Sequence, residues 1–191
     1  LLGGFKLNQN EPQHAYLERK PSINPKRGIG LVWCAGRHKQ PQPERAARMR
    51  DVPFQRMLRH AKQWQKDYGE TLVSLQLGED QDPQVAEMLD NGLLERGIDQ
   101  GMDWDQTASR VENLKLVVTI DTAMAHLCGA LGVPCIVLLN RPCDWRWHQT
   151  GSACALYASS RLARCHNFQD WEDALEQAGQ LVHGMLTTPE N

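Results

Sequence analysis

The sequence predicts an α/β protein in which a parallel sheet is covered by helices on both faces. Two observations lead to this prediction. Short apolar runs, rich in β-branched residues, recur along the chain, and segments with the apolar spacing of amphipathic helices separate them. Strands that are apolar throughout are typical of parallel sheets buried on both sides. Alternation of strand and helix indicates βαβ units.

The strongest apolar runs define four strands of one parallel sheet. They are bounded by glycine, proline or acidic residues, which end extended segments. The expected strands span residues 29–33, 72–76, 116–120 and 134–139. A weaker run, "ACALYAS" at 153–159, is a further strand candidate.

Helices are expected between these strands and after the last of them. Asp82 precedes Pro83 as an N-cap residue precedes a proline at the first helical position, and Gly69 is typical of a helix end. The expected helices span residues 54–68, 82–94, 105–114, 122–131 and 171–185.

The pattern also divides the chain into regions. Residues 1–27 are polar and contain prolines, so we interpret them as an irregular linker or docking arm. Residues 28–186 form the expected α/β domain, and residues 187–191 are a tail.

Composition excludes several classes of protein. The chain has 41% hydrophobic and 23% charged residues with a net charge of −2, which is ordinary for a globular domain and does not indicate a nucleic-acid surface. No apolar stretch approaches the roughly 18 residues that span a bilayer, and the first residues lack the order of a signal peptide. A cytoplasmic protein without a transmembrane segment is therefore expected.

The cysteines are expected to be reduced. The chain has six, without CxxC pairs or zinc-finger spacing, so we expect buried thiols and no structural metal. A disulfide framework or a metal site is the alternative.

One stretch, "TIDTAMAHLCGALGVP" at 119–134, combines a strand end with polar side chains. Asp121 and Thr122 stand where the strand ends and the next helix begins, where free amides and the helix dipole favour anions. His126 lies one turn further along the same face. We predict a diphosphate site here, with Thr122 capping the helix and Asp121 organising the turn. The alternatives are plain N-capping and an ordinary buried histidine.

This stretch resembles the D-T-A-x-A-H-L-x-G-A-L-G-x-P signature of heptosyltransferase-like enzymes, glycosyltransferase family 9. It is most similar to the bacterial branch often fused to tetratricopeptide repeats. The resemblance covers residues 28–183, and further family motifs follow one another in the expected order: "GLVWCAGRHK", "SLQLGED", "DWDQTASRVENLKLVVTIDTA" and "PCDWRW". The chain departs from the family at Lys115, where Asp is common, at Cys34, where Ser is usual, and in the loop at 37–53, which matches less regularly.

The resemblance implies the GT-B architecture, in which two Rossmann-like halves face a cleft. This chain matches the carboxyl-terminal half, which holds the nucleotide-sugar donor. The implied enzyme is an inverting transferase that uses no metal or other cofactor. Its catalytic base is expected in the amino-terminal, acceptor-binding half, so the catalytic residues are unknown and the chain alone is expected to be inactive. The alternative is a non-catalytic nucleotide-binding or protein-interaction domain derived from such an enzyme.

The resemblance also implies partners and site residues. The partners are a nucleotide diphosphate sugar and either an amino-terminal acceptor domain or tetratricopeptide repeats. The expected donor diphosphate site comprises Lys39, Asp121, Thr122, Ala123 and His126. The expected nucleoside site comprises Gln76, Gly78 and Glu79, and the expected cleft loop carries Asp144, Trp145 and Arg146.

Ordinary structural roles remain open for several of these residues. Lys39 and Glu79 could be solvated surface charges. The tryptophans of the cleft loop could cap the core while Arg146 forms a surface ion pair. The same aromatic and cationic groups also suit the face of a sugar or base.

Overall fold

The computed structural model describes residues 14–17, 26–35, 49–78 and 82–187. Six parallel strands form one sheet in the order β3-β2-β1-β4-β5-β6. The strands are β1 (Ile29–Val32), β2 (Leu72–Ser74), β3 (Glu95–Arg96), β4 (Leu116–Ile120), β5 (Cys135–Leu139) and β6 (Ser160–Arg164). The predicted Rossmann-like α/β fold is confirmed, together with the four strong strands and their parallel pairing.

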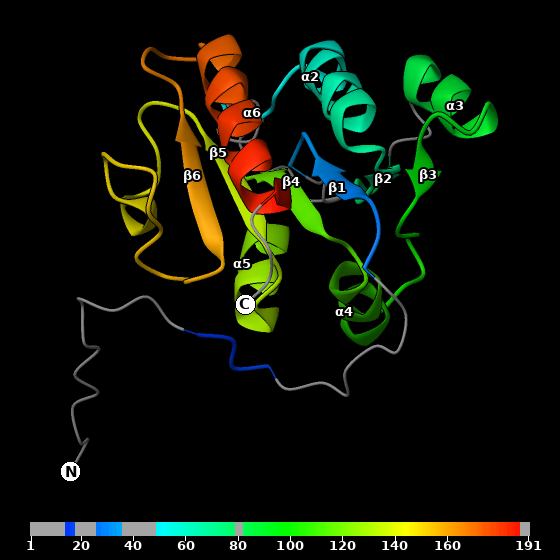
Figure 1. Ribbon diagram of the computed structural model, residues 1–191, viewed down its shortest axis with the longest axis horizontal. Helices are drawn as coiled ribbons and strands as arrows, with labels where there is room; N and C mark the ends of the chain where they lie inside the picture. Colours follow the sequence, from blue (N-terminus) through cyan, green and yellow to red (C-terminus); the bar gives the residue numbers. More distant parts are fainter. Residues whose placement is uncertain (1–13, 18–25, 36–48, 79–81, 188–191) are drawn as a thin grey trace, which may run out of the picture.

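Helices cover both faces of this sheet, as predicted (Figure 1). The described helices are α2 (Phe54–Tyr68), α3 (Pro83–Asp90), α4 (Trp104–Glu112), α5 (Ala123–Leu131) and α6 (Trp171–Thr187), with a short 3₁₀ helix, η2 (Trp145–Trp147). Helices α2, α3 and α6 pack on one face, and α4 and α5 pack on the other.

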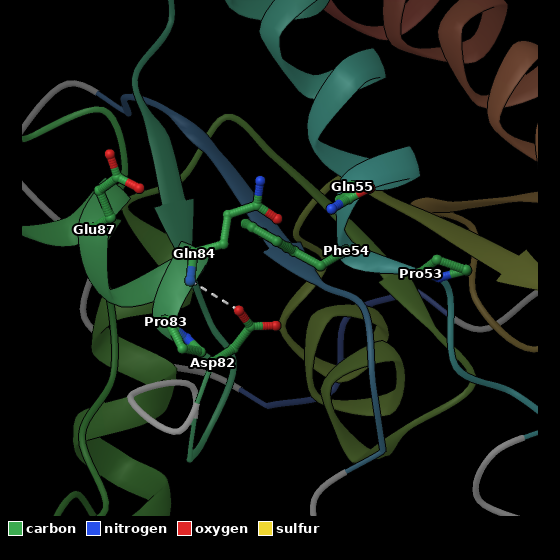
Figure 2. Close-up of a pocket in the computed structure, with 7 residues that line it drawn as sticks. All are labelled: Pro53, Phe54, Gln55, Asp82, Pro83, Gln84 and Glu87. Atoms are coloured by element: carbon green, nitrogen blue, oxygen red, sulfur yellow. Dashed lines mark hydrogen bonds between the residues drawn. The ribbon is translucent and has the colours of Figure 1, made fainter.

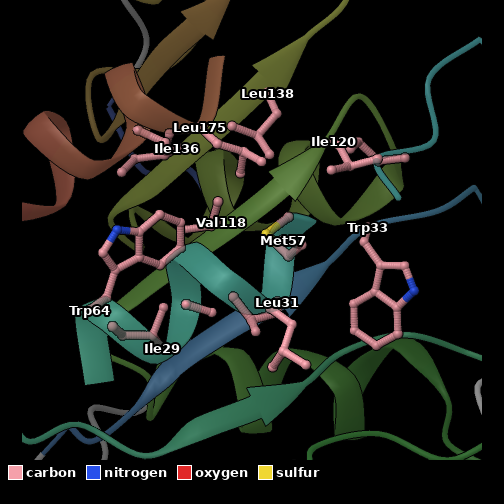
Figure 3. Close-up of a cluster of buried hydrophobic side chains, with 14 of the residues drawn as sticks. Ile29, Leu31, Trp33, Met57, Trp64, Val118, Ile120, Ile136, Leu138 and Leu175 are labelled. Carbon is pink, nitrogen blue, oxygen red and sulfur yellow. The ribbon is translucent and has the colours of Figure 1, made fainter. Parts of the chain in front are cut away.

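The alternation of side chains along the strands divides the core into two clusters. In β4, Val118 and Ile120 face α2 and α6, whereas Val117 faces α4 and α5. Figure 3 shows the first cluster, in which Met57 and Trp64 of α2 lie over the strands. Because every residue of β4 is buried, the strand reads as a continuous apolar run in the sequence.

The strand order places a topological switch point between β1 and β4. The chain builds one half of the sheet outward from β1 and the other outward from β4, and Val32 pairs with Thr119 where the two strands adjoin. Ligands of open α/β sheets bind outside the carboxyl ends of the strands at such a point. The turn at Asp121 and Thr122 directly follows β4, so the fold brings the predicted diphosphate site to this crevice.

The expected strand at 153–159 is wrong. Ala153 forms only an isolated bridge to Arg161, and the last strand is Ser160–Arg164 instead. Its two arginines conceal the strand in the sequence, because this edge strand buries Leu162 and Ala163 while Arg161 faces solvent.

One helix ends clearly earlier than predicted, and one short strand was not expected. The helix expected over 82–94 ends at Asp90, because the chain turns at Gly92, whose φ of +71° is readily available only to glycine. The two-residue strand β3 was not expected, since Glu95 and Arg96 have no apolar pattern.

The described part of the amino-terminal arm lies against α5. The amides of Tyr16 and Leu17 donate to the carbonyl of Ala130 at 2.9 and 3.0 Å. A side chain at Gly132 would meet Ala15, since a Cβ there would lie 2.9 Å from the Ala15 Cβ. Residues 15–17 thus contact α5 and the residue that follows it. Most of residues 1–27 lies outside the described residues, and the linker or docking arm expected there stays a prediction.

Lys115, which stands where the resembled enzymes commonly have Asp, contacts an acidic residue near the amino ends of the strands. The Lys115 ammonium forms an ion pair with Glu70, whose carboxylate also accepts a hydrogen bond from the Gly28 amide at 2.8 Å. The Glu70 side chain is only 12% exposed. Lys115 thus neutralises the charge of the Glu70 carboxylate, which the Gly28 amide just before β1 holds in place.

We expect Lys115→Asp, which introduces the residue common in the enzymes that the sequence resembles, to lower the free energy of unfolding by about 1–2 kcal/mol. The ion pair is lost and two carboxylates then face one another. Urea denaturation measures the change, with Lys115→Arg as the control that keeps the charge. An aspartate variant as stable as the parent chain would contradict this account of Glu70.

The cysteines, all six of which lie in described segments, are free thiols. Burial raises the pKa of Cys165 to about 12 and also raises the pKa of Cys154. In the described part of the chain no three His, Cys, Asp or Glu side chains are grouped as metal ligands. Within the same residues, no helix is long and apolar enough to cross a membrane.

Candidate functional site

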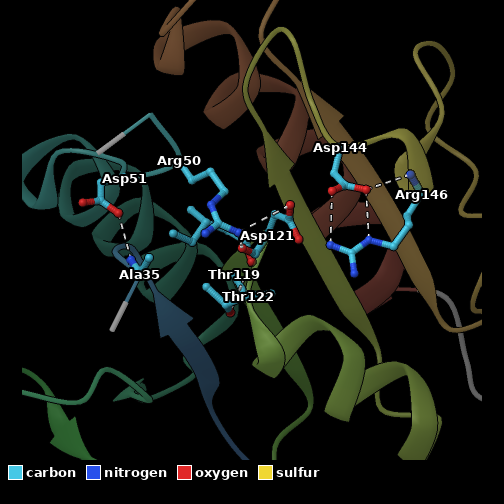
Figure 4. Close-up of polar contacts among 9 residues, drawn as sticks. Ala35, Arg50, Asp51, Thr119, Asp121, Thr122, Asp144 and Arg146 are labelled. Carbon is cyan, nitrogen blue, oxygen red and sulfur yellow. Dashed lines mark hydrogen bonds and ion pairs between the residues drawn. The ribbon is translucent and has the colours of Figure 1, made fainter. Parts of the chain in front are cut away.

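The site centres on the turn between β4 and α5. Asp121 is only 6% exposed, and Arg50 compensates its charge. The Arg50 guanidinium donates to the Asp121 carbonyl at 3.0 Å and lies 3.8 Å from its carboxylate (Figure 4). A buried carboxylate is costly unless it is paired. Arg50 is thus the partner that the structure gives Asp121, and the role of Asp121 in organising the turn stays a prediction.

Thr122 occupies the N-cap position of α5, but its side chain makes no capping hydrogen bond. Its hydroxyl lies 3.3 Å from the hydroxyl of Thr119, which donates to the carbonyl of Ile120. The expectation that Thr122 caps the helix through its side chain is therefore wrong. The amide of Ala125 donates to the Thr122 carbonyl at 3.1 Å, and the hydroxyl of Thr122 accepts from no amide of the first turn, where Ala123 is exposed. The amino end of a helix attracts anions.

His126 stands one turn into α5 and is held on two sides. Its Nδ1 atom lies 2.9 Å from the hydroxyl of Tyr157. Its ring stacks on the indole of Trp147, with centroids 5.2 Å apart and planes at 20°. One ring nitrogen thus has a hydrogen-bond partner, as the alternative of an ordinary buried histidine requires, but the side chain is only half-buried.

His126 lies close enough to the charged groups of the turn and of the cleft loop for them to change its pKa. Burial lowers its pKa, and Arg146 lowers it further, against smaller opposite effects of Asp121 and Asp144. The imidazole is therefore neutral near pH 7. A neutral imidazole offers one N–H donor and one acceptor.

The cleft loop divides its side chains between solvent and core. Asp144 accepts hydrogen bonds from the Arg146 amide at 3.0 Å and from its Nε at 2.9 Å (Figure 4), and these contacts hold the pKa of Asp144 below its usual value. Trp145 is 80% exposed, whereas Trp147 is 1% exposed. The interpretation of tryptophans that cap the core holds for Trp147 alone, and Arg146 does form an ion pair, with Asp144.

The segment expected to bind the nucleoside lies beside the end of β1. Gln76 is buried, and its side-chain oxygen accepts hydrogen bonds from the amides of Trp33 and Cys34 at 3.3 and 3.0 Å. Its acceptor therefore supports the loop after β1. Gly78 is exposed, with a φ of +75°.

Two predicted site residues cannot be placed in this geometry. Lys39 and Glu79 lie outside the described residues. Of the described residues on either side of the segment that contains Lys39, the Ala35 amide donates to the Asp51 carboxylate at 2.8 Å.

An open hollow of about 570 Å³ lies between the starts of α2 and α3 (Figure 2). Because α2 follows β1 and α3 follows β2, it opens at the carboxyl edge of the sheet. The Asp82 carboxylate caps α3 by accepting a hydrogen bond from the Gln84 amide at 3.0 Å, as predicted. The lining residues are Pro53, Phe54, Gln55, Asp82, Pro83, Gln84 and Glu87.

Several residues of this region were missed in the sequence. Arg50 stands in a segment with many cations, so nothing singled it out, and Tyr157 lies in the run taken as a strand. Asn140 had a usable signal, since it follows an apolar run as Asp121 does. Its side-chain oxygen accepts hydrogen bonds from the amides of Arg141 and Gln169 at 2.8 and 2.7 Å.

The six-stranded Rossmann-like fold of the described residues matches one half of GT-B glycosyltransferase structures. The chain is similar to *E. coli* heptosyltransferase WaaC with ADP, at a TM-score of 0.60 and 16% identity over 86% of this chain and 46% of that one. WaaC with ADP-2-deoxy-2-fluoro heptose gives a TM-score of 0.59 and 17% identity over 86% and 45%. The glycosyl transferase family 9 structure from Veillonella parvula DSM 2008 gives 0.55 and 14% over 84% and 46%.

These likenesses confirm the predicted heptosyltransferase-like fold. The chain spans a little under half the length of each of these structures. No protein-family model and no curated protein sequence matches it. The predicted relation to the branch with tetratricopeptide repeats stays a prediction.

Proposed function

We propose that this chain is the donor-binding half of an inverting, metal-independent glycosyltransferase that takes a nucleotide diphosphate sugar. One observation carries the proposal: at the switch point, the start of α5 is left uncapped by Thr122 while Arg50 compensates the buried Asp121. The fold likeness to WaaC structures that contain ADP or an ADP-sugar analogue supports the same reading.

The chemistry asked of this site is the stabilisation of a leaving nucleoside diphosphate. Without a metal, protein donors must balance its growing negative charge. The first-turn amides of α5, the hydroxyl of Thr122 and a neutral His126 supply donors, and Lys39 would add a cation. Asp121 would repel a phosphate, so its pairing with Arg50 suits a role in shaping the turn.

The nucleoside is proposed to lie along Gly78 toward the hollow between α2 and α3. This hollow opens on the same edge of the sheet as the Asp121 turn. It combines an apolar wall at Phe54 with polar side chains such as Gln84, a mixture that suits a base. Glu79 is the proposed acceptor for ribose or base hydrogen bonds.

The acceptor and the catalytic base are proposed to come from a second Rossmann-like half. That partner is an amino-terminal acceptor domain, and an association with tetratricopeptide repeats remains the alternative. The cytoplasmic location expected from the composition also stays a prediction.

Calorimetric titration with ADP, UDP and an ADP-sugar tests the binding site. We expect Thr122→Val and His126→Ala each to weaken diphosphate binding by roughly 1–2 kcal/mol, the cost of leaving a charged acceptor without one hydrogen bond. His183→Ala on α6 is the matched control. Unchanged affinity in both site variants, with both folded, would show that the site is misassigned. If no nucleotide binds the parent chain, the domain is a scaffold or interaction module instead.

A further inference from the structure

A tyrosine and a histidine from distant parts of the chain meet beside the turn that follows β4. The hydroxyl of Tyr157 lies 2.9 Å from Nδ1 of His126, and the two rings meet edge to face with centroids 5.9 Å apart. Trp147 stacks on the imidazole as well. The ring of His126 is thus restrained by a hydrogen bond and by a stacked indole.

The backbone of α5 is shaped for this contact. Gly129 lies one turn beyond His126, and a Cβ at this position would lie 2.2 Å from Cγ of Tyr157. The missing side chain lets the tyrosine ring lie directly on the helix, which is how its hydroxyl reaches His126. Close packing therefore accounts for this small residue of the 119–134 stretch.

The hydroxyl of Tyr157 carries one proton, so it can donate one hydrogen bond. Burial is the main cause that raises its pKa to about 12, and the nearby Tyr16 of the arm adds to the shift. The phenol therefore stays protonated near neutral pH. A protonated phenol can donate to Nδ1 of His126, which lies 2.9 Å from its oxygen.

We propose that Tyr157 is a positioning residue that holds His126 with its proton on Nε2, ready to donate to a diphosphate. Donation to Nδ1 uses the lone pair of that nitrogen, so the ring proton must sit on Nε2. This inference rests on the function proposed above, because it assigns the His126 donor to the anion at the start of α5.

Other charged groups around the imidazole oppose one another. Arg146 disfavours its protonation, whereas Asp121 and Asp144 favour it. A hydrogen bond from Tyr157 to Nδ1 stabilises the neutral ring, and thus acts in the same direction as Arg146. Removing this hydrogen bond should therefore raise the pKa of His126.

Nitrogen-15 NMR of the imidazoles, recorded against pH on the full chain, reads this arrangement without any ligand. In the parent chain we expect His126 in the Nε2–H tautomer, with a pKa below its ordinary value. Tyr157→Phe keeps the ring on Gly129 and removes only the hydroxyl. We expect this variant to show a mixture of tautomers and a raised pKa of His126. ADP affinity, measured by calorimetry, should fall roughly three- to tenfold, the loss that one well-formed hydrogen bond represents.

A second tyrosine–histidine pair provides the control. The hydroxyl of Tyr68 lies 3.0 Å from Nδ1 of His183, on the exposed side of α2 and α6. Tyr68→Phe removes the same chemistry away from the site, and should leave the His126 signals and ADP binding unchanged.

The outcomes separate this inference from the proposed function. An Nδ1–H tautomer in the parent chain would overturn the role of Tyr157, even if the variant failed to fold. So would unchanged tautomer and pKa in folded Tyr157→Phe. A parent chain that shows the expected NMR signals but binds no ADP would overturn the proposed function, and with it the diphosphate as the recipient of the His126 proton.

Discussion

Trp147→Ala is expected to lower the free energy of unfolding by about 3–5 kcal/mol, the usual cost of removing a large aromatic side chain from a core. The indole is 1% exposed and packs among the apolar side chains beneath α4 and α5. It also stacks on His126 at 5.2 Å. Its loss would leave a cavity and release one side of the imidazole, so nucleotide binding should weaken together with stability.

Thermal unfolding measures this loss. For a domain of this size, about 3–5 kcal/mol corresponds to a fall of roughly 6–20 °C in Tm. Trp145→Ala is the matched control, because the neighbouring indole is 80% exposed and its removal should change stability by less than about 0.5 kcal/mol. Equal losses in the two variants would show that the loop does not divide its tryptophans between core and solvent.

A milder variant separates packing from hydrogen bonding. The indole Nε1 of Trp147 is buried and finds no acceptor among the described residues. Trp147→Phe removes this donor while it keeps an aromatic face for His126. It should therefore cost clearly less stability than Trp147→Ala and retain most of the nucleotide affinity.

The isolated chain of 191 residues is expected to bind a nucleotide diphosphate and to transfer no sugar at a measurable rate. The chain spans 46% of WaaC, and its described residues form one Rossmann-like sheet. In the proposed function this sheet is one wall of a two-domain cleft, and one wall cannot position an acceptor or a general base against the bound donor. Proximity and general-base catalysis supply a large share of the rate, and both would be absent.

A transfer assay with ADP-sugars and UDP-sugars tests this expectation on the same preparation that is used for calorimetry. Nucleotide binding in that preparation shows that the chain is folded, and intact E. coli WaaC serves as the positive control for the assay. Turnover onto any acceptor by the purified chain alone would contradict the prediction, and would require a base among the residues of this chain.

The elements whose signals are local were predicted well from the sequence. The helix at 54–68 and the strand at 116–120 have the predicted bounds. The helix repeats its buried apolar residues with helical spacing and ends at Gly69, and the strand is a continuous apolar run that ends before Asp121. The Asp82 cap was also predicted, since a capping side chain bonds an amide only two residues away. The strand β6 was missed because its burial depends on the sheet edge beside it rather than on its own pattern.

The position of the turn after β4 was predicted and its contacts were not, while the binding site itself stays a prediction. Asp121 and Thr122 were placed correctly at the end of a central strand, because strand ends are visible in the sequence. The choice of Arg50 as the partner of Asp121 spans 71 positions, and several other cations of the same segment were equally plausible. The hydroxyl of Thr122 turns toward Thr119 rather than capping its helix, which depends on how the turn is packed.

The sequence by itself thus determined the α/β class, the central strands and the position of the turn that follows β4. These properties follow from periodicity and from contacts between residues a few positions apart. Only the tertiary structure decided that Trp147 is buried while Trp145 is exposed, and that Tyr157 meets His126 over Gly129. Such contacts join segments far apart in the chain, and their geometry is set by how the helices and loops pack on the sheet.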